Sequence, residues 1–136
     1  MIGILIVTHG KLSTELLNSA ELIIGKQDNV KTLNLNADDD IKLLREEVAL
    51  EAQQLNTGKG VLVLTDLYGG SPFNVTAANM GENYIESLTG VNLPMLIEAL
   101  ILRLHSGLDE VTKGCYKAGI EGIKNVRQEL FKKNTK

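Results

Sequence analysis

Runs of apolar residues alternate with amphipathic stretches along the chain, and the two patterns predict strands and helices in turn. Residues 2–7 and 61–64 are continuous apolar runs, as expected of strands that are buried on both faces of a sheet. Residues 30–35 alternate more clearly between apolar and polar, and residues 84–89 form a fourth predicted strand. The chain thus carries four candidate strands with candidate helices between them.

Apolar residues at helical spacing predict a helix after each of these strands. Gly25 is typical of the residue that ends a helix, and the carboxylates of residues 38–40 suit the positive end of the second helix. Ser71 is expected to cap a third helix that runs to about Met80, and residues 125–133 also have a helical pattern. The predicted helices begin near Leu12, Ile41, Pro72, Pro94 and Asp109.

This order of elements predicts an α/β fold, a doubly wound and mostly parallel sheet with helices on both faces. In such sheets ligands and chemistry lie beyond the carboxyl ends of the strands, where the strand order reverses. The loops after the first and third predicted strands often flank that point, and they contain His9 and Asp66. We therefore expect these two side chains at the same edge of the sheet.

Composition narrows the class of protein. The chain has 136 residues, 43% of them hydrophobic and 23% charged, which is typical of one soluble domain, and we expect residues 1–136 to form it. A net charge of −3 leaves no broad basic surface for nucleic acid or an anionic membrane. Cys115 is the single cysteine, so no internal disulfide is possible. The apolar N-terminal run lacks a basic region and is too short to span a membrane, so we expect a cytoplasmic protein.

His9 and Asp66 are the strongest candidates for chemistry. A lone histidine after a strand is ordinarily a surface residue, but Gly10 leaves room for a partner or a phosphate to approach its ring. Asp66 alone would be a loop-capping residue. Paired with His9, its carboxylate would accept from one ring nitrogen and leave the lone pair of the other nitrogen free to attack.

Residues 69–74 form a glycine-rich loop that opens a predicted helix, and its free N–H groups suit an anion. Ser71 either caps that helix or donates to a phosphoryl oxygen. The loop matches neither of the two glycine-rich nucleotide motifs. Asn92 is interpreted as a turn residue, His105 as a solvated residue near a helix end, and Cys115 as a core residue. We expect no metal or cofactor, because one histidine and one cysteine so far apart make a poor ligand set.

Three segments together resemble the mannose-family enzyme IIA of the bacterial sugar phosphotransferase system (PTS): residues 4–10, 61–74 and 90–96. The resemblance covers nearly the whole chain. It implies that His9 takes a phosphoryl group from the carrier HPr and passes it to enzyme IIB, which links it to the membrane subunits IIC and IID. It also implies that Asp66 orients His9 through Nδ1 and leaves Nε2 to be phosphorylated. The residues expected to bind the phosphoryl group are Thr8, Gly10, Gly69, Gly70 and Ser71.

The resemblance also implies a strand order of 2-1-3-4 and a homodimer. In that dimer an antiparallel C-terminal edge strand, around residues 126–131, is exchanged between the subunits. This expectation conflicts with the helical pattern of residues 125–133. The transported sugar does not follow from this chain, because the membrane subunits choose it.

Three other functions share features with this pattern. The phosphotransferase subunit of a PTS-dependent dihydroxyacetone kinase has the same fold and a histidine after the first strand, and it remains the alternative; the loop at residues 69–74 favours the sugar-transport branch. A histidine phosphatase or mutase would need Arg-His-Gly, whereas Thr8 precedes His9, and it would need a second catalytic histidine, for which His105 has no suitable setting. A response-regulator-like domain would need an acidic pair after the first strand, where Thr8 and His9 stand instead.

Overall fold

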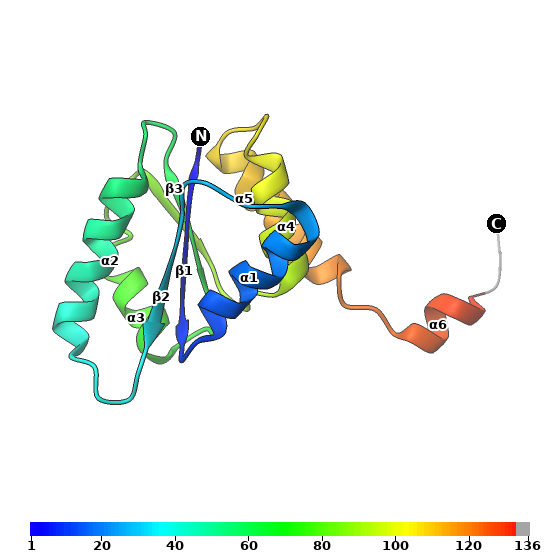
Figure 1. The fold of residues 1–136 in the computed structure, drawn as a ribbon, viewed down its shortest axis with the longest axis horizontal. Helices are drawn as coiled ribbons and strands as arrows, with labels where there is room; N and C mark the ends of the chain where they lie inside the picture. Colours follow the sequence, from blue (N-terminus) through cyan, green and yellow to red (C-terminus); the bar gives the residue numbers. More distant parts are fainter. Residues whose placement is uncertain (133–136) are drawn as a thin grey trace.

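A computed structural model describes residues 1–132 and places a four-stranded parallel sheet between two layers of helices (Figure 1). The strands are β1 (Gly3–His9), β2 (Val30–Leu35), β3 (Val61–Thr65) and β4 (Ile85–Leu88). They lie side by side in the order β2-β1-β3-β4, and each neighbouring pair is parallel. The predicted α/β class and the strand order 2-1-3-4 are therefore confirmed.

Six helices complete the described part of the chain. They are α1 (Leu12–Ile24), α2 (Ile41–Leu55), α3 (Gly70–Ala77), α4 (Leu93–Leu102), α5 (Leu108–Glu121) and α6 (Val126–Phe131). Helices α1, α4 and α5 cover one face of the sheet, and α2 and α3 cover the other (Figure 1). Within residues 1–132, no helix is both long enough and apolar enough to cross a membrane.

The core divides into two halves because successive side chains of a strand point to opposite faces. In β1, Ile4 and Ile6 pack with α1, α4 and α5, whereas Leu5 and Val7 pack with α2 and α3. Residues 61–65 of β3 are also fully buried. The two central strands are thus covered on both faces, as their continuous apolar sequences predict.

The direction in which successive strands are added to the sheet reverses at β1. From β1 it passes through α1 to β2 on one side, and then through α2 to β3 on the other side of β1. The loops that leave β1 and β3 therefore run to opposite faces of the sheet, which opens a crevice at their carboxyl ends. Val7 pairs with Thr65, so the two strands end at almost the same level.

Helix α3 begins and ends earlier than its sequence predicts. Ser71 was expected as the cap, but the cap is Gly69, whose φ of +92° lets the chain turn into the helix two residues sooner. The helix ends at Ala77 rather than Met80. The side-chain amide of Asn79 donates to the Val75 carbonyl at 2.8 Å and so replaces a backbone hydrogen bond of a further helical turn.

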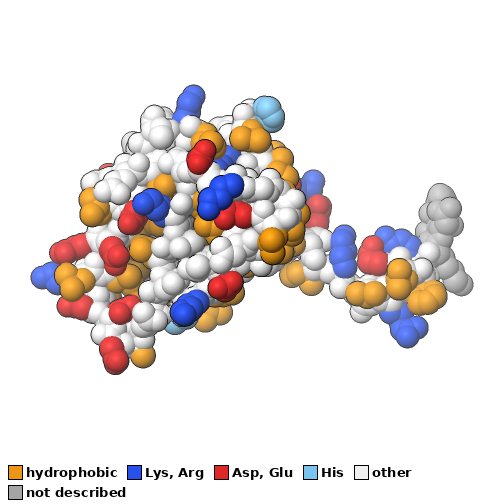
Figure 2. Space-filling view, viewed as in Figure 1, with side chains coloured by type: hydrophobic (Ala, Val, Ile, Leu, Met, Phe, Trp, Pro, Cys, Tyr) orange, Lys and Arg blue, Asp and Glu red, His pale blue; other side chains and the backbone are white. Residues whose placement is uncertain are grey.

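The expected C-terminal edge strand is absent from the described residues. Residues 126–131 form helix α6, which lies away from the layered body, and its apolar side chains are exposed (Figures 1 and 2). The helical pattern of the sequence is therefore confirmed for this single chain, although Lys133, at the end of the predicted range, lies outside the described residues. A lone segment forms a helix because a helix satisfies its own backbone hydrogen bonds, whereas an edge strand needs a neighbour.

Candidate functional site

His9 and Asp66 meet at the carboxyl edge of the sheet. His9 is the last residue of β1, and Asp66 directly follows β3, the strand that pairs with β1. The distance between Nδ1 of His9 and Oδ2 of Asp66 is 2.8 Å. The two side chains therefore lie together, as the predicted switch point requires.

The Asp66 carboxylate holds His9 at two points. Its Oδ2 atom also accepts a hydrogen bond from the backbone N–H of His9 at 2.9 Å, and its Oδ1 atom accepts one from the Leu67 N–H at 2.9 Å. Burial raises the pKa of Asp66, but the hydrogen bonds from the His9 backbone and ring, together with the ring's charge, outweigh burial and lower that pKa overall. Because an ionised carboxylate only accepts, Nδ1 carries the proton in this contact, and in the neutral ring Nε2 therefore has the free lone pair.

The free edge of the His9 ring faces the start of α3. The His9 side chain is 50% exposed, whereas the Asp66 side chain beneath it is only 12% exposed. A Cβ atom built on Gly70 would lie 3.4 Å from Cε1 and 3.6 Å from Nε2 of His9. Glycine at this position therefore keeps the space beside Nε2 open.

The N-terminus of α3 suits an anion next to that space. No side chain caps this helix at Gly69, so the N–H groups of its first turn have no partner within the helix. The helix dipole adds partial positive charge at the same end. A cavity of about 380 Å³ adjoins it and is lined by His9, Gly10 and Ser71, with residues of the loop between β2 and α2. The predicted glycine-rich loop and His9 are thus brought together.

Thr8 lies beneath this surface. It is fully buried, and its hydroxyl accepts a hydrogen bond from the Ser13 N–H at 2.8 Å. Ser13 is also fully buried, and its hydroxyl donates to Oδ1 of Asn34 at 2.6 Å. Sequence reasoning missed Ser13 and Asn34. The available signal was a polar residue between Leu33 and Leu35, near the end of a strand that flanks β1.

The remaining candidates have structural roles. The side chain of Asn92 accepts from the Met95 N–H at 3.0 Å, so its structural role is to cap α4 rather than to stabilise a turn. Cys115 is buried in the core, and burial raises the pKa of its thiol to about 12. His105 is exposed in the turn between α4 and α5. Among residues 1–132, no three His, Cys, Asp or Glu side chains gather where a metal ion could bind.

Comparisons with known proteins agree on one family. The family described as PTS system fructose IIA component (EIIA-man) matches residues 3–115. The PTS system mannose-specific EIIAB component of Escherichia coli K12 is 35% identical over 134 residues, which are 97% of this chain and 42% of that protein. The PTS system fructose-specific EIIA component of Bacillus subtilis is 31% identical over 132 residues, or 96% of this chain and 85% of that protein.

Solved structures give the same result. The phosphotransferase system component EIIA from Streptococcus agalactiae superposes with a TM-score of 0.85 at 36% sequence identity, covering 94% of this chain and 99% of that one. The mannose/sorbose-specific IIA subunit from Enterococcus faecalis superposes with a TM-score of 0.81 at 26% identity, covering 91% of this chain and 93% of that one. The present chain spans less than half the length of the E. coli relative.

Proposed function

Since this chain belongs to the mannose family of PTS EIIA components, which transfer phosphoryl groups in sugar uptake, we propose that Nε2 of His9 accepts a phosphoryl group from phospho-HPr and passes it to enzyme IIB. The observation that carries this proposal is the 2.8 Å contact between Nδ1 of His9 and Asp66, which leaves Nε2 free on a half-exposed side chain. Residues 1–136 would act as one cytoplasmic domain, linked to the membrane subunits IIC and IID only through enzyme IIB.

The proposed step forms one bond and breaks one. The lone pair on Nε2 attacks phosphorus in line as the phosphorus–nitrogen bond of the donor histidine breaks, and the donor ring keeps that electron pair. Nδ1 retains its proton throughout, so the phosphorylated ring of His9 carries a positive charge next to the Asp66 carboxylate. That charge pair stabilises the transition state and the phosphohistidine without a metal. Transfer to enzyme IIB reverses the same step on a second histidine.

The phosphoryl oxygens would lie against the first turn of α3. Its free N–H groups and the hydroxyl of Ser71 can donate to them, and Gly10 and Gly70 leave room for the group around the ring. The negative phosphoryl group also suits the positive end of the helix dipole. We therefore assign Gly69, Gly70 and Ser71 to phosphoryl binding.

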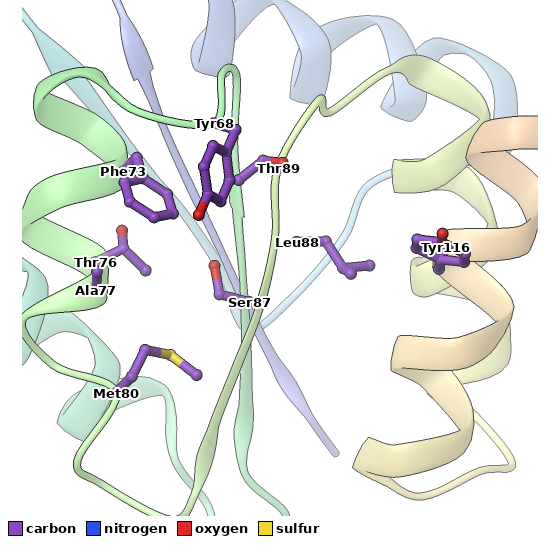
Figure 3. Close-up of a pocket in the computed structure, with 9 residues that line it drawn as sticks. All are labelled: Tyr68, Phe73, Thr76, Ala77, Met80, Ser87, Leu88, Thr89 and Tyr116. Atoms are coloured by element: carbon purple, nitrogen blue, oxygen red, sulfur yellow. The ribbon is translucent and has the colours of Figure 1, made fainter.

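The donor and the acceptor would dock on the loop that follows Asp66. Leu67 and Tyr68 are 58% and 83% exposed, so the site has an apolar rim. The rings of Tyr68 and Phe73 lie 4.7 Å apart. Tyr68 belongs to this rim, whereas the apolar cavity of about 380 Å³ that both rings line lies along β4 and is not part of the docking surface (Figure 3). Such a rim supports a brief contact of modest area, as a carrier needs.

A second part of the proposal is a homodimer. Strand β4 pairs only with β3 among residues 1–132, so its other edge is free, and the same apolar cavity lies along it (Figure 3). Helix α6 exposes Val126, Leu130 and Phe131 by 68–71%. We propose that residues 126–131 leave the helical form and pair with β4 of a second subunit as an exchanged antiparallel strand. That exchange would cover both the free edge and the exposed apolar side chains.

Phosphate labelling tests the proposed function. The protein is incubated with labelled phosphoenolpyruvate, enzyme I and HPr, and the label should be acid-labile and base-stable, as expected of a phosphohistidine. His9→Ala should abolish labelling. Asp66→Ala should slow it by roughly two to four orders of magnitude, because the ring loses its orienting acceptor and its charge partner. Addition of enzyme IIB should then discharge the labelled protein.

His105→Ala is the matched control, because it removes the other histidine of the chain at an exposed turn and should leave labelling unchanged. Normal labelling of His9→Ala would refute the assignment, and loss of the label at alkaline pH would point to an aspartyl phosphate instead.

A further inference from the structure

Helix α1 lacks a capping side chain of its own, and Thr8 supplies one from the preceding strand. Only Gly10 and Lys11 separate His9 from α1, and the side chain of Lys11, at the cap position, makes no hydrogen bond to the helix. Instead, the Thr8 hydroxyl accepts from the Ser13 N–H at 2.8 Å, with both residues fully buried. The short link that contains His9 is therefore closed by a hydrogen bond across its base.

The same hydrogen-bonded group ties this link to the neighbouring strand. Asn34 of β2 pairs with Thr8 of β1, and its Oδ1 atom accepts from the Ser13 hydroxyl at 2.6 Å and from the Thr14 hydroxyl at 3.2 Å. The Gly10 N–H donates to the Leu35 carbonyl at 2.8 Å. The residues immediately before and after His9 are thus both anchored to β1–β2 contacts, while Asp66 holds His9 from the side of β3.

We propose that Thr8, Ser13 and Asn34 form a positioning network that fixes His9 for phosphoryl transfer; this inference rests on the proposed function. None of the three is placed against the phosphoryl group. Thr8 faces α1, whereas the next residue of the strand, His9, points to the opposite face of the sheet. The network acts through the backbone of residues 8–13. Buried and mutually bonded polar groups resist displacement, because any shift leaves one of them without a partner.

Rigidity at this point matters because in-line transfer depends on sub-ångström placement of the attacking nitrogen. The hydrogen bonds of Asp66 hold the His9 ring and the His9 backbone N–H relative to β3, but they do not reach residues 10–13 on the α1 side. With the network intact, the ring and its backbone are held from both neighbouring strands.

Single-turnover phosphoryl uptake from phospho-HPr tests the network. Thr8→Val keeps the shape and removes the acceptor, and we expect the maximal uptake rate to fall about 10- to 100-fold with little change in apparent affinity for phospho-HPr, because the docking surface is untouched. Thr8→Ser restores the hydroxyl and should recover most of the rate. Ser13→Ala keeps the backbone bond to Thr8 but removes the bond to Asn34, so it should fold and show a smaller loss of the same kind.

Thr112→Val is the matched control, since it removes a partly buried hydroxyl bond to the Leu108 carbonyl within α5, a helix that carries none of the candidate site residues. The ring ¹⁵N shifts of His9 give a second readout, which a loss of stability alone would not change. In Thr8→Val the displaced backbone should loosen the contact between Nδ1 and Asp66, so the shifts should show a mixture of tautomers. In Thr112→Val the shifts should match the wild-type pattern. Wild-type rates and shifts in Thr8→Val and Ser13→Ala would overturn the network. Failure of the wild-type protein to take up label would refute the proposed function instead, whatever the ring shifts show.

Discussion

Gly70 occupies a position where any side chain would fill space beside Nε2 of His9. Its φ of +81° lies in the left-handed region that favours glycine, and an added Cβ would come within 3.6 Å of Nε2 of His9. The backbone conformation and the open space beside Nε2 therefore both require glycine at position 70.

Gly70→Ala should lower both stability and phosphoryl uptake. The strained φ costs about 1–2 kcal/mol of unfolding free energy, and the methyl group beside the ring should slow uptake about 10- to 100-fold, because it displaces the incoming phosphorus. Gly25→Ala is the control: its φ is +92°, but nothing lies within 4 Å of the added atom, so it should lose stability without losing rate. Urea unfolding and quenched-flow labelling give the two quantities. Equal uptake rates in the two variants would contradict the proposed contact.

The site residues differ in how far the sequence predicts them. His9 and Asp66 could be predicted because one ends an apolar strand and the other directly follows one, and the fold brings such positions together. Ser13 and Asn34 could not, because a serine in the first turn of a helix and an asparagine in an alternating strand are ordinary surface residues by pattern. Their burial arises only when α1 packs beside the β1–β2 pair.

At the scale of the elements, Arg103 ties the opposite end of the sheet together. The guanidinium at the end of α4 is almost fully buried and donates to the carbonyls of Ile2, Asp28 and Asn29 and to the side chain of Gln27. Burial lowers its pKa, and the charge of Asp28 partly offsets that effect. One side chain thus joins α4 to the starts of β1 and β2, at the edge of the sheet away from His9.

Arg103→Met should destabilise the fold by roughly 2–4 kcal/mol, because it leaves the carbonyls of Ile2 and Asp28 without a donor, whereas the Asn29 carbonyl keeps its bond from the Ile4 N–H. Arg103→Lys should restore little, since a single ammonium group cannot reproduce the planar fork. Arg45→Met, at an exposed position of α2, is the matched control and should change stability by less than about 0.5 kcal/mol. Urea denaturation measures all three variants. The folded fraction of Arg103→Met should still label at the wild-type rate, and a slower rate would mean that the two ends of the sheet are coupled.

Pattern alone predicts the elements better than their arrangement. The continuous apolar runs identify β1 and β3 as central strands, but hydrophobicity does not say which strand neighbours which, and the order 2-1-3-4 came from the family resemblance. Boundaries shift where a side chain competes with the helix, as Asn79 does at the end of α3. The predicted strand at residues 84–89 is shorter, Ile85–Leu88.

At the scale of the whole molecule, the C-terminal segment is the part that does not pack against the layered body. Helix α6 has no buried residue, and Figure 2 shows its apolar side chains gathered on a lobe outside the main body. Exposed apolar side chains of this kind mark an interaction surface. The free edge of β4 and the adjoining cavity are the counterpart that the same chain offers to a second copy.

The proposed exchange predicts that the protein is a dimer in size-exclusion chromatography with light scattering. Leu130→Glu should raise the dimer dissociation constant at least about 100-fold, because each subunit would bury a charge in place of a leucine. Asn125→Asp changes the charge equally at an exposed position just before the exchanged segment and should stay dimeric. A monomeric wild-type protein, or a dimer that survives Leu130→Glu unchanged, would contradict the exchange.

The single open edge of the His9 ring limits how the proposed donor and acceptor proteins can use the site. Asp66 occupies Nδ1, so a partner protein can reach the ring only at Nε2. This atom lies between the loop after β2 and the start of α3. If His9 carries the phosphoryl group as proposed, two proteins cannot reach one nitrogen at once, and loading and unloading must alternate in a double-displacement cycle. An excess of unphosphorylated donor would then slow transfer to the acceptor by occupying the site. The rate of phosphoryl transfer would depend on the ratio of donor to acceptor as much as on the concentration of either.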